Sequence, residues 1–420
     1  MSGGENISSG HNPWSIGNQA RASVHILNVA QTYFPYAAEG GRPAKVRAIS
    51  GKLAEHGHSV TVLTANLGMS EWLRVAHQPE ETRMGLESTE NGIVAIYLPT
   101  LARYRVLTIN PRVIRFCRGL LAGFDLVHFY GLYDLLGPMV GYFCRREGIP
   151  YVIEPMGMYR PIDRAIRMKK IWHRTVGGAF WRNAAKIIAT SELEQQELEE
   201  DGVAQAKIAI RYNGIDLSAK NTPRGEFRLK WGILADEPLI LFLSRLIPRK
   251  GADVLIEAFA AACPEWGRLV IVGPEGEPGY QAQLEQCAQD CGVRARVLFT
   301  GPLYEEDKIS VLADADVFAL PSRYENFANV VAEAIACGVP VIITPFCGIR
   351  SLVDGRAGLV VNPEKKAFAA ALEAMLHDRL LYARLKESCR EVALQFSWDH
   401  LTDQMEGYYQ EILARGRSVS

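Results

Sequence analysis

Residues 238–256 read PLILFLSRLIPRKGADVLI, and this stretch decides the fold. Its first six residues, Pro238–Leu243, form a short apolar run that is typical of a buried strand. A basic turn follows at once, and Gly251 permits the tight turn that leads into a helical pattern. The stretch therefore predicts a strand, a turn and a helix in series, which is the repeating unit of a parallel α/β sheet.

The same unit recurs on both sides of this stretch. In the second half of the chain, further strands are predicted at 269–272, 297–299, 317–320 and 339–343. In the first half, a helix is predicted at 45–56, and strands at 23–29, 59–64, 93–98, 126–130, 151–154 and 187–189. Strands that alternate with helices predict the α/β class, with two consecutive Rossmann-like halves built on parallel sheets.

A polar, proline-containing stretch at 218–226 separates the two halves. We expect an N-terminal domain at 23–217, a C-terminal domain at 218–395 and a final helical segment at 396–420 that packs back on the N-terminal domain. Residues 1–22 are polar and rich in Gly and Ser. They predict a disordered lead-in and not a signal peptide.

Composition excludes several classes of protein. The 420 residues carry 46 Lys+Arg against 47 Asp+Glu, a formal net charge of −1. This balance argues against a nucleic-acid partner and against a disordered chain. No apolar run approaches the roughly 18 to 20 residues that span a bilayer, and the eight Cys are scattered without a zinc or disulfide pattern. We expect a cytoplasmic protein whose membrane contact, if any, is peripheral on the inner face of the cytoplasmic membrane.

The near-zero net charge hides one strongly basic block. Residues 101–186 contain 15 Lys+Arg against 5 Asp+Glu, and aromatic residues such as Trp172 and Trp181 lie among the cations. Basic helices with aromatic residues suit an anionic membrane surface or a pyrophosphate-bearing acceptor. They equally suit a helix whose aromatic residues are core and whose cations are solvated. Both interpretations remain open at this stage.

Two loops carry residues suited to phosphate. Arg245 and Lys250 follow a strand directly, where open α/β sheets bind ligands, and they supply a donor fork and a compact charge. Gly40 and Gly41 lie in the turn after the first strand and allow close backbone approach. The chain has no G-x-G-x-x-G after that strand and no Walker A segment, which disfavours a dinucleotide-dependent dehydrogenase and a P-loop NTPase.

The segment 321–340 places two acidic residues around a helix start. Glu325 lies just before the helix, and Glu333 lies on it eight residues later. Amides at 327–330 suit a diphosphate, which leaves Glu325 to accept from sugar hydroxyls and Glu333 from a ribose diol. Acidic residues also favour helix starts and wet helix faces without any ligand. The apolar neighbours of Glu333 predict that it is buried and therefore needs a partner.

Taken in order, these motifs identify a family. From Ser23 to Leu413 the chain resembles the retaining glycosyltransferases of family four, which have the GT-B fold of two facing Rossmann-like domains. The motifs that carry the resemblance are Gly40-Gly41, Leu53 with Gly57-His58-Ser59-Val60, Asp125-Leu126-Val127-His128, Ser191-Glu192, Asn213-Gly214-Ile215-Asp216, Arg245 with Lys250-Gly251, Val272-Gly273-Pro274, Gly301 and the segment 321–340.

The resemblance implies the reaction and its residues. A hexose-type sugar would move from a UDP- or GDP-sugar to a hydroxyl of a glycan, lipid-linked or polysaccharide acceptor, with retention and without a metal, as in cell-envelope polysaccharide biosynthesis. Arg245, Lys250 and Glu325 would be catalytic. The donor-binding residues would be Gly40, Gly41, Arg245, Lys250, Gly273, Leu303, Glu325, Asn326, Phe327, Ala328, Asn329 and Glu333.

The chain departs from the family at two positions. Met156 stands where many relatives carry His or Arg beside the donor sugar, so a hydrogen-bond donor is lost. Tyr130 stands where many have His. His128 and Glu154 are the candidates to compensate, although a lone His at the end of a buried strand is as often structural. The acceptor-side set is therefore His128, Tyr130, Glu154 and Met156.

Other functions remain as alternatives. A nucleotide-sugar epimerase or a phosphorylase would use the same fold, and Met156 is a hint of a catalytically weakened protein that binds sugar nucleotides. Asp314-Ala315-Asp316 is not expected to bind a metal: it precedes a buried strand, where Asp316 is expected to make structural hydrogen bonds.

Overall fold

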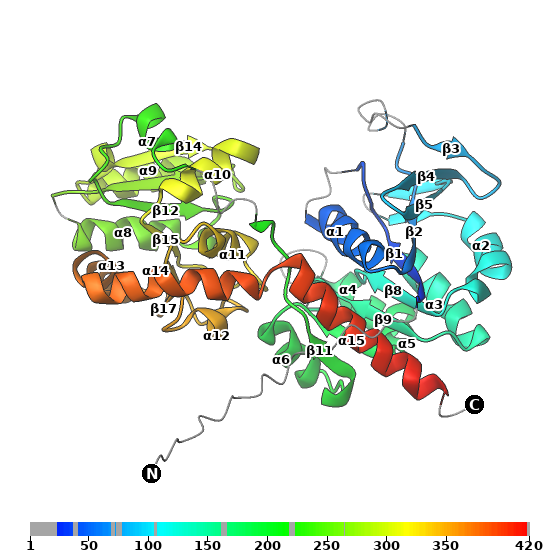
Figure 1. Ribbon diagram of the computed structural model, residues 1–420. Coiled ribbons are helices and arrows are strands. Elements are labelled where there is room, and N and C mark those ends of the chain that lie inside the picture. The colour runs from blue at the N-terminus through cyan, green and yellow to red at the C-terminus, as the bar shows by residue number, and fades with distance from the viewer. Residues whose placement is uncertain are drawn as a thin grey trace, which may run out of the picture.

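The computed structural model describes residues 23–36, 41–68, 72, 78–104, 107–160, 166–217, 223–263 and 265–417. It consists of two α/β halves that lie side by side, and the long final helix runs from the C-terminal half across the N-terminal half (Figure 1). The predicted α/β class with two Rossmann-like halves is confirmed. Gly40 lies outside the described residues, and Gly41 is the first residue of helix α1.

The N-terminal half contains, within the described residues, a nine-stranded sheet in the order β11-β10-β9-β8-β1-β2-β5-β4-β3. Neighbouring strands are parallel except at β4, which runs antiparallel to both β5 and β3. The strands are β1 (His25–Ala30), β2 (Ser59–Ala65), β3 (Glu80–Glu81), β4 (Leu86–Glu90), β5 (Ile93–Leu98), β8 (Leu126–Tyr130), β9 (Tyr151–Glu154), β10 (Lys186–Ala189) and β11 (Ile208–Ile210).

Helices cover this sheet, and their limits follow local signals. They are α1 (Gly41–Glu55), α2 (Arg112–Leu120), α3 (Leu136–Glu147), α4 (Ile166–Arg174), α5 (Val176–Arg182) and α6 (Glu192–Glu200). Helix α6 begins after Ser191 because the Ser191 hydroxyl accepts from the Glu194 N–H, a standard N-cap. A separate hairpin joins β6 (Ala102–Tyr104) to β7 (Leu107–Ile109).

The C-terminal half is built on a six-stranded, wholly parallel sheet, counted within the described residues, in the order β14-β13-β12-β15-β16-β17. The strands are β12 (Leu239–Leu243), β13 (Arg268–Val272), β14 (Val297–Gly301), β15 (Val317–Leu320), β16 (Val341–Ile343) and β17 (Gly358–Val360). The helices are α7 (Glu226–Trp231), α8 (Ala252–Ala262), α9 (Tyr280–Asp290), α10 (Glu305–Asp314), α11 (Asn329–Ala336), α12 (Arg350–Val353), α13 (Lys365–His377) and α14 (Arg379–Leu394).

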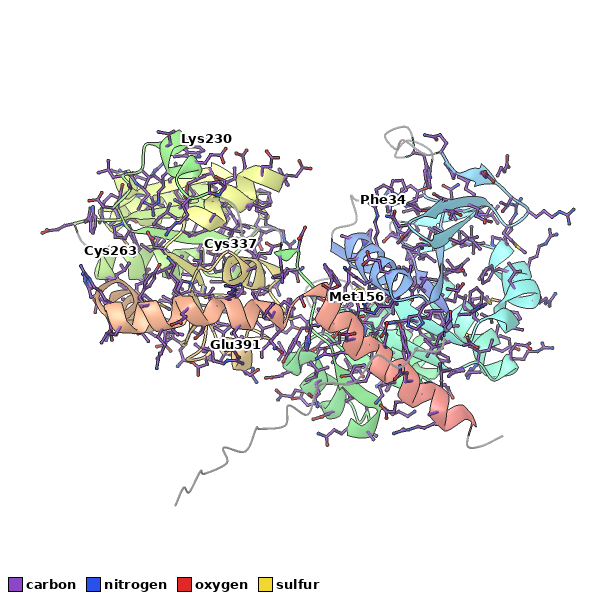
Figure 2. The ribbon with its side chains drawn as sticks, viewed as in Figure 1. Phe34, Met156, Lys230, Cys263, Cys337 and Glu391 are labelled. Carbon is purple, nitrogen blue, oxygen red and sulfur yellow. The ribbon has the colours of Figure 1, made fainter. Side chains whose placement is uncertain are left out.

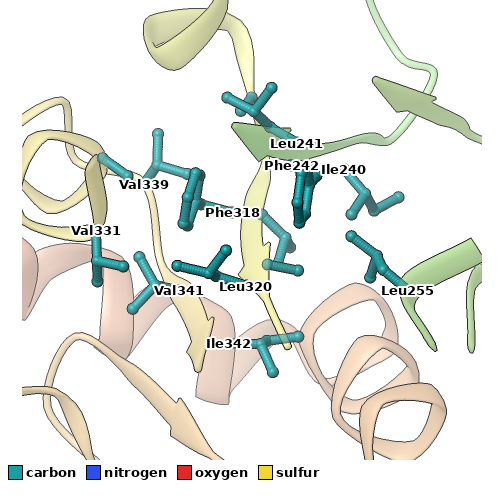
Figure 3. Close-up of a cluster of buried hydrophobic side chains, with 14 of the residues drawn as sticks. Ile240, Leu241, Phe242, Leu255, Phe318, Leu320, Val331, Val339, Val341 and Ile342 are labelled. Atoms are coloured by element: carbon teal, nitrogen blue, oxygen red, sulfur yellow. The ribbon is translucent and has the colours of Figure 1, made fainter. Parts of the chain in front are cut away.

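The apolar strand runs form the core of the C-terminal half. Leu241, Phe242 and Phe318 are fully buried, and Figure 3 shows them with their neighbours between the strands and the covering helices. Parallel strands covered on both faces read as continuous apolar runs, which is why the sequence reveals them. Every strand predicted in either half is present, with ends displaced by two residues at most. The short β3, β4, β6, β7, β11 and β17 were not predicted.

The last helix, α15 (Trp398–Arg417), ties the two halves together. It leaves the C-terminal half after α14 and packs against the N-terminal half, where Tyr408 donates to the Ile210 carbonyl at 3.1 Å. Glu406 Oε1 lies 2.7 Å from His56 Nδ1 and 3.1 Å from His58 Nε2. The predicted return of the C-terminal helix to the N-terminal half is therefore confirmed.

Candidate active site

The donor residues predicted in the loops of the C-terminal half lie at the carboxyl edge of the C-terminal sheet, whereas Gly41 belongs to the N-terminal half. Because β12, β13, β14 and β15 are parallel neighbours, the loops that follow them open on the same edge. Arg245 follows β12, Gly273 follows β13, Leu303 follows β14 and Glu325 follows β15. The topology thus gathers residues that are far apart in the sequence.

Lys250 and Glu325 hold each other in place. The Lys250 ammonium forms an ion pair with the Glu325 carboxylate, and these side chains are only 11% and 12% exposed. The Glu325 backbone is fixed as well, since its N–H donates to the Phe346 carbonyl and its own carbonyl accepts from the Gly348 N–H, each at 2.9 Å. A cation and an anion therefore sit at defined positions on the edge where a ligand would bind.

The other loops at this edge contribute one exposed cation, one half-buried apolar side chain and one glycine. Arg245 is exposed at the same edge, and Leu303 is half-buried against the core. Gly273 has φ of +146°, and a Cβ there would overlap the Ser244 carbonyl oxygen. The glycine is thus needed for the close packing of two loops, which Leu246 joins by donating to the Pro274 carbonyl at 2.9 Å.

Helix α11 starts at the same edge with free amide groups. Ala328, which precedes it, has φ of +65°, and the amides of Ala328, Asn329 and Val330 have no acceptor among the described residues. The first amides of a helix are unpaired by geometry and carry partial positive charge. This is the position at which the sequence predicted a diphosphate.

The other residues of this segment have different roles. Phe327 is buried and its ring packs against Tyr212 and Phe396, so only its backbone can face the cleft. The Asn326 side chain reaches the N-terminal half, where it donates to Thr190 Oγ1 at 2.6 Å and accepts from Ser191 Oγ at 2.9 Å. Asn326 therefore links the two halves with its side chain.

The expectation that Glu333 is buried is wrong. Its side chain is 29% exposed because it lies on the cleft side of α11, and it pairs with Lys308 at 2.5 Å. The expected partner is thus present: the Oε2 atom that contacts Lys308 is buried, and the rest of the side chain is partly accessible. Glu333 and Asn329 line a cavity of 580 Å³ between the two halves. The full lining is Arg42, Ala44, Lys45, Ala48, Met156, Met158, Asn213, Gly214, Ile215, Asp216, Asn329, Glu333 and Trp398.

Met156 faces this cavity from the N-terminal half. It is half-buried, has φ of +58°, and lies where the two halves meet (Figure 2). The next residue, Gly157, also has positive φ, and its N–H donates to Glu194 Oε1 at 2.7 Å. A buried carboxylate therefore anchors the turn that presents Met156 to the cleft.

The three other acceptor-side residues lie in the interior. His128, Tyr130 and Glu154 are 0%, 1% and 0% exposed. The rings of His128 and Tyr130 stack at 4.1 Å, and His128 Nδ1 lies 2.7 Å from the Tyr409 hydroxyl of α15. Of the four predicted acceptor-side residues, only Met156 lines the cavity, and the structural interpretation of His128 matches its surroundings.

A buried charge cluster lies behind Met156, and sequence reasoning missed two of its members. Glu154 pairs with both Lys45 of α1 and Arg211, which follows β11. Burial alone would raise the pKa of Glu154, but the charges of Arg211 and Lys45 outweigh it and lower that pKa to about 2. Burial lowers the pKa of His128 to about 3, so the imidazole is neutral at pH 7.

Lys45 is the member of this cluster that reaches the cavity. Burial lowers the pKa of its ammonium to about 8, against the opposing effect of Glu154. Its Nζ also donates to Asn213 Oδ1, and Asn213 Nδ2 donates to Asn329 Oδ1 at 2.9 Å. A chain of polar contacts therefore crosses the cleft from Lys45 to the first residue of α11.

The two aspartates before β15 are structural, as expected for Asp316. Asp316 accepts from Arg224 at 2.9 Å, from Arg228 at 2.8 Å and from the Leu239 N–H at 2.9 Å. Asp314 accepts from the Arg228 N–H at 3.0 Å. Asp316 therefore attaches α7 to the sheet, and Asp314, the last residue of α10, attaches α7 to α10.

The basic block divides into core and surface. Tyr159 and Phe180 are buried, and Lys186 is buried and paired with Glu411 at 3.0 Å. Met168 and Ile171 of α4 are exposed. Arg105 and Arg164 lie outside the described residues.

No helix in the described part of the chain combines the length and the apolar character that crossing a bilayer requires.

Comparison with known proteins identifies the fold and the family. Residues 223–392 match the family model of glycosyl transferases group 1, and residues 44–219 match that of Glycosyltransferase Family 4. A D-inositol 3-phosphate glycosyltransferase of Xylanimonas cellulosilytica is 30% identical over 400 residues, which cover 90% of this chain and 93% of the relative. The chain belongs to glycosyltransferase family 4.

Further similarities agree with this family. The D-inositol 3-phosphate glycosyltransferase of Geodermatophilus obscurus is 32% identical over 93% of this chain and 88% of its own. Two solved structures share the fold. HepE of Anabaena in complex with UDP superposes with a TM-score of 0.72 and 21% identity, covering 92% of this chain and 100% of its own. Sucrose-phosphate synthase of Thermosynechococcus elongatus superposes with a TM-score of 0.68 and 23% identity, covering 93% of this chain and 100% of its own. The GT-B fold is confirmed, and the protein is a glycosyltransferase that uses a nucleotide sugar.

Proposed function

We propose that this family 4 glycosyltransferase moves a hexose from a UDP- or GDP-sugar to an acceptor hydroxyl with retention of the anomeric configuration. The observation that carries the proposal is the Lys250–Glu325 ion pair beside Arg245 and the free amides of α11. The donor diphosphate would lie against the amides and the two cations, and its sugar would point to Glu325. Glu333 is accessible for a ribose diol.

The charges at this edge support a reaction without a metal. A diphosphate leaving group gains negative charge as the glycosidic bond breaks, and preorganised cations and amides stabilise that charge. Arg245, Lys250 and the α11 amides provide such groups. The residues needed for metal-free departure of the leaving group are thus available, and metal independence remains part of the proposal.

Retention is proposed to occur on a single face of the sugar. A double displacement requires a carboxylate nucleophile on the far face. Glu154, the carboxylate nearest to Met156 in sequence, is buried and paired with Arg211 and Lys45, which makes it a poor nucleophile. In the front-face route, the acceptor oxygen forms the new bond as the diphosphate leaves, and a diphosphate oxygen takes the acceptor proton.

Transfer assays test this proposal against its alternatives. We expect release of nucleoside diphosphate that depends on an acceptor, with a product of unchanged anomeric configuration by NMR. An epimerase would convert the donor without any acceptor, and a phosphorylase would require inorganic phosphate. A weakened binding protein would bind the donor and release nothing with any acceptor tried. Activity that is abolished by EDTA and restored by a divalent cation would contradict metal independence.

For the acceptor, we propose a glycan or lipid-linked molecule that bears phosphate. The relatives named D-inositol 3-phosphate glycosyltransferase act, by that name, on a phosphorylated acceptor. In this chain, Arg42 lines the cleft cavity, and its guanidinium lies 3.2 Å from the Met158 sulfur, which leaves other N–H groups for an anion. A phosphate group on the acceptor would find its counter-charge there.

We also propose that helices α2 and α3 contact an anionic membrane surface. The two helices pack together on the side of the N-terminal half that is remote from the C-terminal half (Figure 1). They expose apolar residues together with arginines, namely Ile114, Leu120, Met139, Tyr142, Arg115, Arg118, Arg145 and Arg146. Apolar side chains among cations suit the headgroup region of anionic lipid.

Vesicle flotation tests the membrane proposal. At low salt, the protein should float with vesicles that contain anionic lipid and not with neutral ones, and salt should release it. The double variant Arg115→Glu and Arg118→Glu should stay at the bottom. The matched control is Arg384→Glu and Arg390→Glu on the exposed face of α14, which should float like the wild type. Equal flotation of both double variants would contradict the assignment of this surface.

A further inference from the structure

The family resemblance implies a polar side chain where this chain has Met156, and the structure contains a cation that lines the same cavity from α1. Lys45 and Met156 both line the 580 Å³ cavity between the halves. Lys45 is 5% exposed, which is unusual for lysine unless it is paired or functional. Lys45 is not one of the solvated lysines of a helix surface, because its ammonium contacts Glu154 of the buried charge cluster.

The surroundings of Lys45 leave it an N–H group that no described residue accepts. Arg211 also pairs with Glu154, so two cations share the carboxylate that contacts Lys45, the buried Glu194 acts on Lys45 more weakly than Glu154 does, and the neutral His128 adds no charge. A lysine ammonium has three N–H groups, and the described residues take two of them, through Glu154 and Asn213. One N–H therefore has no acceptor among the described residues, and Lys45 lines the cavity.

The contact with Asn213 connects Lys45 to the opposite wall of the cleft. Asn213 accepts from Lys45 and donates at 2.9 Å to Asn329, the first residue of α11. Lys45 and Asn329 thus lie on opposite walls of the cleft with the Asn213 side chain between them. The Lys45 ammonium and the free amides of α11 are all N–H donors that carry positive charge, so a group that contacts both is an anion with several oxygens.

We propose that Lys45 is a donor-contacting residue that stabilises the leaving diphosphate from the N-terminal half, in place of the polar side chain that Met156 lacks. This inference rests on the proposed function, because it assumes that the diphosphate lies at the start of α11. It assigns to α1 a role in catalysis that the sequence motifs did not assign. The bond that breaks is the sugar–phosphate bond, and Lys45 acts only by its charge and its N–H group.

The proposal predicts a characteristic pH profile. The value of about 8 for the pKa of Lys45 means that its charge is lost as the pH rises through 8, and kcat/KM for the donor should fall in the same range. Lysine in an unfolded chain titrates near 10.5, so between pH 8 and 10.5 the unfolded state binds more protons and the contribution of Lys45 to stability rises. A loss of activity between pH 8 and 10.5 therefore cannot be caused by unfolding through the titration of Lys45.

The charged and titratable groups around Lys45 are Glu154, Arg211, His128, Glu194, Arg42, Asp216 and Glu333.

Three variants separate this role from a structural one. Lys45→Met should lower kcat/KM for the donor about 100-fold, the effect typical of losing one donor to a developing anion, and should weaken UDP or GDP binding. Lys45→Arg should recover much of the loss at pH 7 and, because arginine stays charged, keep its activity up to pH 9. Lys52→Met, at a partly exposed lysine on the same helix that does not line the cavity between the halves, is the matched control and should behave as wild type.

The outcomes distinguish failure of this inference from failure of the proposed function. If Lys250→Ala abolishes transfer while both Lys45 variants keep the wild-type kcat/KM and pH profile, Lys45 has no such role and the function stands. If the wild type transfers no sugar, or if Lys250→Ala is fully active, the proposed function itself fails. If circular dichroism shows that Lys45→Met is unfolded, the pH profile of Lys45→Arg tests the proposal instead. A fall in kcat/KM for the donor near pH 8 that is the same in Lys45→Arg as in the wild type would overturn the proposal.

Discussion

The Lys250 ammonium and the Glu325 carboxylate form an ion pair across the carboxyl edge of the C-terminal sheet, although 75 residues separate them in the sequence. Each side chain is nearly buried, so each needs the other. The pair fixes a cation where a phosphate would lie and a carboxylate where sugar hydroxyls would lie. Its two members are therefore the first residues to test.

Lys250→Ala and Glu325→Gln should each reduce sugar transfer by about 100-fold or more, because each removes a preorganised charge at the reacting centre. The thermal midpoint should fall by only a few degrees, since the site is at the edge of the sheet. The matched control is Lys230→Ala, which breaks an exposed ion pair with Asp307 in the same half. Near-normal activity of both site variants would show that the site lies elsewhere.

The Asn326 side chain should control how firmly the two halves associate. It bridges Thr190 and Ser191 of the N-terminal half, one residue from Glu325. Asn326→Ala should increase hydrogen exchange at 190–198 and at 324–328 and should lower kcat, because Glu325 loses its link to the opposite wall. Ser388→Ala, which removes a hydroxyl that bonds only within exposed α14, is the control. Unchanged exchange in both segments would contradict the bridging role.

Glu197 should make stability depend on pH. Burial raises the pKa of Glu197 to about 7, although Tyr324 donates to it at 3.1 Å from the other half. Between pH 4.5 and 7 the folded chain therefore binds more protons than the unfolded chain, and the contribution of Glu197 to stability falls as the pH rises. Relative to wild type, Glu197→Gln should gain thermal stability from pH 5 to pH 8. A midpoint difference that is constant over this range would contradict the assignment.

Arg211 should be essential for stability. It is fully buried and pairs with Glu154, which is buried as well. Arg211→Met breaks this buried pair and leaves Lys45 as the remaining ion-pair partner of Glu154. Breaking a buried ion pair costs about 3 to 5 kcal/mol. We expect Arg211→Met to lower the denaturation midpoint strongly, and the exposed Arg182→Met to leave it nearly unchanged. Equal midpoints for the two variants would contradict this prediction and would show that Lys45 alone suffices to stabilise the buried Glu154 carboxylate.

The sequence predicted the parts of this molecule that depend on local pattern. Buried parallel strands are continuous apolar runs, and the carboxyl ends of such strands gather at one edge, so Arg245, Lys250 and Glu325 could be placed together from their positions after strands. The ion pair between Glu325 and Lys250 could not be predicted, because it depends on the conformations of the loops that follow β12 and β15.

The charge cluster shows where sequence reasoning stops. Glu154 accepts from Arg211, 57 residues later in the chain, and Lys45 donates to Asn213 over 168 residues. No local pattern marks these partners, because lysine in a helix and arginine after a strand are usually solvated. Burial of His128 and Tyr130 follows from the packing of α15 against the N-terminal sheet, which only the tertiary structure reveals. A lysine flanked by apolar residues near the start of α1 was the one available signal.

The most direct test of the central claim is a thermal-shift panel of UDP-, GDP- and ADP-sugars on the intact chain. A ligand that binds only the native state raises its midpoint. We predict that at least one nucleotide sugar raises the midpoint of the wild type by several degrees and has no effect on Lys250→Ala, while Lys230→Ala responds as wild type. If no nucleotide sugar shifts the wild type, or if Lys250→Ala shifts equally, donor binding at the Lys250–Glu325 edge is contradicted.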